Sequence, residues 1–122
     1  MSGTTSGVAF FPSGEDVTMH VFRGKSLAFE IVWGGTDPID ISGATAALQA
    51  RDRDGSLMLD LSTANGGIAI DGAAGRLTFS GAPAVTAAVS ATGIYEVELT
   101  TAEGAVHRVI SGVVVPVDGV VR

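Results

Sequence analysis

The chain alternates apolar and polar residues at the two-residue period of a β-strand, most clearly in two stretches. In LAFEIVW, residues 27–33, every second residue is large and apolar. In IYEVELT, residues 94–100, Ile94, Glu96 and Glu98 fall on one side, and the aromatic and aliphatic residues between them fall on the other. Because successive side chains of a strand point to opposite faces, both stretches predict strands with one face in a core and one toward solvent.

Turn signals separate further runs of this kind. Asp54-Gly55 predicts a hairpin with a type I′ turn, and GAAG, residues 72–75, predicts a second hairpin. About eight strands, with turns at intervals of roughly 8–12 residues, predict an all-β fold. We expect an antiparallel β-sandwich, immunoglobulin-like or a related small barrel. The alanine-rich segment 82–92 has helix-compatible spacing and allows one short helix.

The first residues differ in composition from the rest. A chain of 122 residues has the size of one domain. Residues 1–16 are rich in Gly, Ser and Thr and are predicted to form a flexible N-terminal arm, whereas residues 17–122 are predicted to form the β-sandwich domain. Phe10 and Phe11 are adjacent aromatics on this arm. We expect them to fold back on the domain or to contact a neighbouring protein.

The charge and cysteine content exclude several classes of function. The net charge is −6, and the 7 basic residues are scattered among 13 acidic ones, so a phosphate-binding surface and nucleic acid binding are not expected. The absence of cysteine removes disulfides, thiol nucleophiles and cysteine zinc sites. No run approaches the roughly 18 apolar residues of a membrane helix, so no membrane partner is expected.

The candidate chemical motifs have simpler structural explanations. RDRDGS, residues 51–56, resembles the start of a calcium loop, but Thr63 occupies the place of the closing acid. Glu96 and Glu98 on one strand face resemble a paired-carboxylate site, but alternate acids are also ordinary on a solvent-facing strand. The two histidines are far apart in sequence, and no GxSxG motif occurs. We predict a non-enzymatic protein with no catalytic residue, metal or cofactor.

Trp33, the only tryptophan, ends the run LAFEIVW and precedes two glycines. Core packing at a strand end is the role we expect for it. The alternative is an exposed indole that stacks on a sugar beside Asp37 and Asp40, which would make the protein a carbohydrate-binding β-sandwich module. A buried Trp33 favours the core role, and an exposed Trp33 favours sugar binding. Together with Phe10 and Phe11, Trp33 is a candidate interaction residue.

The order of these patterns resembles the small structural proteins of tailed bacteriophages and phage-like particles. The segments that carry the resemblance are FRGKSLAFEIVW, DPIDISGATAALQARDRDG, GRLTFSG and GIYEVELTTAEGAVHRVISGVVVPVDGVVR, in that order. They lie within residues 17–122. The residues that match the pattern of these proteins are Trp33, Pro38, Asp40, Gly43, Tyr95, Glu98, Gly104, Arg108 and Gly112.

This resemblance implies a virion structural protein with an immunoglobulin-like or related β-sandwich. Its expected role is an adaptor or attachment module in the tail, baseplate or fibre region, with capsid decoration or a head spike as the alternative. The implied partners are other virion proteins and copies of the chain itself, in a trimer or ring. Assembly would take place in the bacterial host cytoplasm, and an N-terminal arm that adds a strand to a neighbour's sheet suits such a role.

Overall fold

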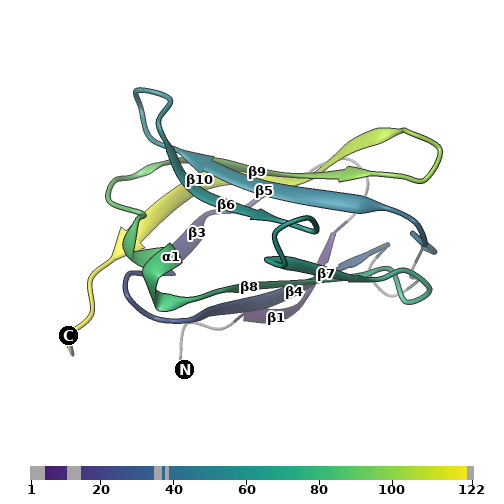
Figure 1. The fold of residues 1–122 in the computed structure, drawn as a ribbon, viewed down its shortest axis with the longest axis horizontal. Coiled ribbons are helices and arrows are strands. Elements are labelled where there is room, and N and C mark those ends of the chain that lie inside the picture. Colours follow the sequence, from purple (N-terminus) through teal and green to yellow (C-terminus); the bar gives the residue numbers. More distant parts are fainter. Residues whose placement is uncertain (1–4, 11–14, 35–36, 38, 121–122) are drawn as a thin grey trace.

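A computed structural model of the chain confirms the predicted all-β sandwich: two sheets pack face to face and one short helix closes one end (Figure 1). It describes residues 5–10, 15–34, 37 and 39–120. Sheet A has the order β1-β4-β8-β7. Its strands are β1 (Thr5–Phe10), β4 (Leu27–Trp33), β8 (Arg76–Gly81) and β7 (Ile68–Asp71).

Sheet B is the larger sheet, and β10 lies near one edge of it. The order is β10-β9-β5-β6, and β2 and β3 pair with successive parts of the free side of β10. Its strands are β2 (Glu15–Asp16), β3 (Met19–Phe22), β5 (Thr45–Arg51), β6 (Leu57–Ser62), β9 (Gly93–Thr100) and β10 (Val106–Val117).

The strand order has the immunoglobulin pattern. If β4 to β10 are lettered B, C, C′, D, E, F and G along the chain, and β1 is A, sheet A reads A-B-E-D and sheet B contains G-F-C-C′. Most neighbouring strands within each sheet therefore come from distant parts of the sequence. In strand order, the predicted sandwich therefore agrees with its immunoglobulin-like form.

The N-terminal strands differ from the expected antiparallel pattern. β1 runs parallel to β4 at the edge of sheet A, and β2 and β3 run parallel to β10 at the edge of sheet B. The chain thus starts on one sheet and continues on the other. The eight strands β3 to β10 lie in residues 17–122, as predicted, whereas β1 and β2 lie within residues 1–16. The division into a flexible arm and a domain stays a prediction.

The core lies between the two sheets and is filled by alternate residues of the strands. In β5 and β9 buried residues alternate with more exposed ones, as the sequence period predicts. Phe79 is fully buried and stacks on Phe29 of the neighbouring strand, with ring centroids 4.4 Å apart. The other fully buried large side chains are Ile31, Leu48, Leu59, Leu77, Leu99, Val21, Val89, Val97, Val109 and Val114.

The predicted short helix is α1 (Pro83–Ala87), between β8 and β9. Pro83 stands at its first turn, where a missing N–H costs nothing. Thr86 is buried, and its hydroxyl donates to the carbonyl oxygen of Lys25 at 2.7 Å. This bond fixes α1 to the turn before β4. No helix in the described part of the chain is long and apolar enough to cross a membrane.

Tyr95, near the start of β9, ties the middle of sheet B to its edge. Its hydroxyl donates to the carbonyl oxygen of Val17 at 2.5 Å, in the segment between β2 and β3. Burial raises the pKa of Tyr95 well above its ordinary value, and the negative charge of Asp16 raises it further. The folded protein therefore favours the neutral phenol, which is the form that donates the hydrogen bond.

Replacing Tyr95 with phenylalanine is expected to lower the free energy of unfolding by about 1–2 kcal/mol, because the Val17 carbonyl loses its donor. Since folding raises the pKa, the contribution of Tyr95 is complete below the ordinary tyrosine pKa of about 10 and is lost as the pH rises above it. Urea unfolding followed by Trp33 fluorescence should show wild type losing stability above pH 10 more steeply than Tyr95→Phe. Parallel pH profiles would contradict this assignment.

Candidate interaction surface

The three predicted interaction residues do not share one location in the structure. Trp33 is only 4% exposed and belongs to the core. Phe10 ends β1, which is described at the level of its backbone. Phe11 lies outside the described residues. An interaction role for the two phenylalanines stays a prediction, and the buried indole has little surface to offer a partner.

Trp33 is held at the end of β4 by contacts on both sides. Its ring lies against His107 of β10, with centroids 5.7 Å apart, and its backbone N–H donates to the Gly75 carbonyl oxygen at 2.7 Å. Asp37 and Asp40 are exposed. The Asp40 carboxylate accepts a hydrogen bond from the Ser42 hydroxyl and a second one from the Ser42 backbone N–H. These two bonds, the first more than the second, hold the pKa of Asp40 below its usual value. The exposed indole that the sugar-binding hypothesis requires is therefore not formed.

The RDRDGS segment forms the β5–β6 hairpin turn, and its acidic residues are used locally. The Asp52 carboxylate accepts the backbone N–H groups of Asp54 and Ser56, each at 2.9 Å. The predicted type I′ turn is wrong, because that turn needs positive φ at both central residues. Gly55 has φ +83°, but no described residue other than glycine has a positive φ. Within the described ranges, no group of three His, Cys, Asp or Glu side chains could hold a metal.

The paired carboxylates Glu96 and Glu98 lie on the outer face of sheet B. Glu96 forms an ion pair with Arg108 of β10, with Nε and Oε2 2.7 Å apart, and Glu98 is exposed. His20 is exposed on β3 beside Val115, well along β10 from His107. The two acids thus have the solvent-face arrangement, and the two histidines are not brought together.

The outer face of sheet B carries three exposed apolar side chains in one cross-strand row, with Arg51 of β5 between two of them. Ile94 of β9 is 68% exposed, Leu57 of β6 is 46% exposed and Val113 of β10 is 41% exposed. Register places them in line, because Arg51 of β5 pairs with Leu57 on one side and Ile94 on the other, and Ile94 pairs with Val113. We call these four residues the apolar row. It lies beside the β5–β6 turn, at one end of the sheet (Figure 1).

Acidic residues occupy the neighbouring positions on the same face. The next cross-strand row pairs Asp60 with Gln49, Gln49 with Glu96, Glu96 with Ser111, and Ser111 with Asp16. Asp16 and Asp60 are exposed, as is Glu98 one step further along β9. Only Glu96 has an ion-pair partner among the described residues of this row. We call this the acidic row, and it gives the face a negative potential beside its apolar part.

Sequence reasoning missed the apolar row, although one signal for it was present. Ile94 is in phase with Glu96 and Glu98, so the alternation that predicts β9 also predicts an isoleucine on the polar face. Leu57 and Val113 give no such signal. The strand pair that holds each of them contains an irregularity in register, between Ala50 and Arg51 in the β5–β6 pair and between Arg108 and Ile110 in the β9–β10 pair.

An open depression of about 640 Å³ lies on the side of the sandwich, between the ends of β4 and β8, α1 and the β6–β7 turn. Its lining is mostly backbone and small side chains, with Asp60 as the one charged residue. Asn65 fills part of the adjoining turn, accepting the backbone N–H groups of Ser62 and Gly67 and donating to the Asp60 carbonyl. The depression therefore has few groups to orient a ligand.

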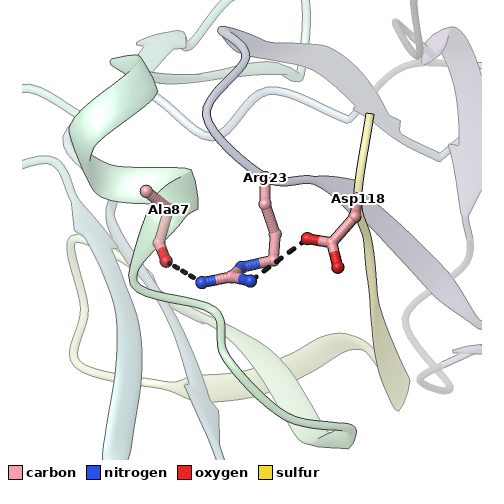
Figure 2. Close-up of polar contacts among 3 residues, drawn as sticks. All are labelled: Arg23, Ala87 and Asp118. Carbon is pink, nitrogen blue, oxygen red and sulfur yellow. Dashed lines mark hydrogen bonds and ion pairs between the residues drawn. The ribbon is translucent and has the colours of Figure 1, made fainter. Parts of the chain in front are cut away.

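Arg23 joins three segments at the end of the sandwich closed by α1 (Figure 2). Its guanidinium donates to the carbonyl oxygen of Ala87, the last residue of α1, at 2.9 Å, and forms an ion pair with Asp118 at 3.1 Å. A cation suits a helix C-terminus. The Arg23 Nε is buried and has no partner among the described residues, which offsets part of the gain. This cluster is structural.

Replacing Arg23 with alanine is expected to lower the free energy of unfolding by about 1 kcal/mol, through the lost bond to the Ala87 carbonyl. Asp118→Ala should cost less than about 0.5 kcal/mol, because its carboxylate is exposed and the ion pair is screened by water. Arg53→Ala, in the exposed β5–β6 turn, is the matched control with no expected change. Equal losses in Arg23→Ala and Asp118→Ala would show that the ion pair, not the helix contact, carries the effect.

Comparison with known proteins gives a likeness at the level of structure. No family model matches the sequence, and no curated protein matches it. Among solved structures, the N-terminal domain of phage TP901-1 ORF48 superimposes with a TM-score of 0.56 and 12% sequence identity. The match covers 93% of this chain and 98% of that one. The likeness is one of fold. It extends over nearly the whole sandwich of a phage protein domain.

Proposed function

We propose that this protein is a non-enzymatic structural protein of a tailed bacteriophage particle, an adaptor or attachment module in the tail, baseplate or fibre region. The observation that carries the proposal is the fold likeness to the N-terminal domain of phage TP901-1 ORF48, which covers 98% of that domain. The order of strand and turn patterns along residues 17–122 supports it independently, because it resembles small phage structural proteins.

The described side chains also support a binding role over catalysis. The acids of sheet B face solvent or an ion-pair partner, the histidines are separate, and the one tryptophan is buried. What the molecule offers instead is a broad sheet face that combines apolar and acidic residues. Such faces suit protein partners. The expected partners are other virion proteins, with copies of the chain itself in a trimer or ring.

The test is to purify particles from a lysate of the phage or prophage that encodes the chain and to identify their proteins by mass spectrometry. We expect the chain in every particle preparation, at a copy number that is a multiple of the local symmetry. Immunogold labelling then gives its position. Label on the tail or its tip supports the adaptor role, label on the capsid supports decoration or a head spike, and absence from particles overturns the proposal.

A further inference from the structure

We infer that the outer face of sheet B is the docking surface for another virion protein, whose contacting surface combines an apolar ridge with lysine or arginine residues. This inference rests on the proposed function. The apolar row supplies the centre of the contact, and the acidic row beside it selects the charge of the partner.

The apolar row exposes large apolar side chains to water on the outer face of sheet B, and such exposure is unfavourable unless a partner covers them. Ile94 is on β9, between β10 and β5, so it has a neighbouring strand on both sides. With Leu57 and Val113 in the same cross-strand line, it forms an apolar row that Arg51 interrupts on β5. The Arg51 guanidinium is held by the Gly55 carbonyl and the Gln49 side chain, so its stem fills the position between Leu57 and Ile94. Rows of this kind mark interaction sites.

The acidic residues decide the chemistry of the partner. Asp60 and Glu98 are exposed on the face, whereas Arg108 is paired with Glu96 and the Arg51 guanidinium is turned toward its own hairpin. The uncompensated charge is therefore negative, in a chain whose net charge is −6. A partner that presents cations beside an apolar ridge is attracted to the negative face, so it associates faster, and its charges complement those of the face once it has docked.

A second copy of the chain is a poor occupant of this face. In a two-fold pair packed face to face, the symmetry axis lies between the faces, and the same patch contacts itself. An axis along the strands sets the acidic row against its own copy. This arrangement opposes like charges, whereas a basic partner would oppose unlike ones, so the face fits a different protein better.

The experiment complements a deletion of the gene with plasmid-borne variants and counts copies per purified particle by quantitative mass spectrometry. Ile94→Asn removes the centre of the apolar row, and we expect incorporation to fall roughly tenfold or more, as for a central contact residue. Val120→Asn, at an exposed valine outside the sheet, is the control and should be incorporated like wild type. Circular dichroism and thermal unfolding of the purified variants verify that each is folded.

The charge of the partner is tested by a matched pair of variants. Glu98→Lys reverses a charge on the face, and Glu103→Lys reverses one in the exposed β9–β10 turn. We expect a roughly tenfold loss of incorporation for the first and no loss for the second. Equal incorporation of the two would overturn the assignment of a basic partner.

The outcomes separate the two proposals. If wild type is found in particles and Ile94→Asn is not incorporated, both the proposed function and the docking surface are supported. Wild type in particles with Ile94→Asn at the wild-type copy number overturns the docking surface and leaves the proposed function standing. Absence of wild type from particles overturns the proposed function and, with it, this inference.

Discussion

Replacing Phe79 with alanine is expected to lower the free energy of unfolding by about 3–5 kcal/mol. Phe79 is fully buried in β8, the strand that joins β4 to β7 in sheet A. It pairs with Phe29 on one side and Ile68 on the other, and its ring stacks on that of Phe29. Truncation removes a large apolar group and leaves a cavity between the sheets, which the flanking strands cannot fill without losing register.

The measurement is urea unfolding followed by the fluorescence of buried Trp33. Phe22→Ala is the matched control, because Phe22 lies on β3 and is 37% exposed. Its loss should be below about 1.5 kcal/mol, since little cavity forms. Similar midpoints for the two variants would mean that Phe79 does not anchor the core. The slope of the urea dependence should stay that of wild type, because truncation changes stability and not the surface exposed on unfolding.

The strands that follow a clear two-residue period were predictable from sequence, because burial on one face imposes that period. β4 and β9 are the best examples, and Glu96 and Glu98 lie on the solvent face that their phase predicts. The short helix in residues 82–92 was also predictable, since proline and alanine suit a first turn. These features depend on residues close in sequence.

Features that depend on distant pairing were not predictable. β1, with the sequence TSGVAF, has no clear two-residue period of its own, and it forms a strand along the edge of β4. The β5–β6 turn was assigned from Asp54-Gly55, but its conformation depends on the whole loop and on the Asp52 carboxylate that binds two backbone N–H groups. Local dipeptide preferences give the position of a hairpin better than its turn type.

The candidate interaction surface shows the same limit. Ile94 can be placed on the outer face from its own strand, but its alignment with Leu57 and Val113 needs the register of three strand pairs. Two of those pairs contain register shifts that no single strand reveals. A one-residue shift moves a side chain to the opposite face. The sequence therefore predicts the exposed isoleucine but not the apolar row.

Gly93→Ala is expected to lower the free energy of unfolding by about 3 kcal/mol, the upper part of the usual range for overpacking. A Cβ at residue 93 would overlap the carbonyl oxygen of Arg51 and would lie 3.0 Å from the Cα of Asp52. Both obstacles are backbone atoms, one in the last residue of β5 and one in the residue after it, so neither can rotate away. The start of β9 must move from the end of β5.

The matched control is Gly55→Ala, where a Cβ would meet nothing within 4 Å but the backbone has φ +83°. Its cost should be about 1–2 kcal/mol, from conformation alone. A larger loss for Gly93→Ala in urea unfolding would isolate the steric contribution, and equal losses would contradict it. Because Arg51 pairs directly with Ile94, the same displacement separates two members of the apolar row. A Gly93→Ala protein that remains folded should therefore also be incorporated into particles at a lower copy number than wild type.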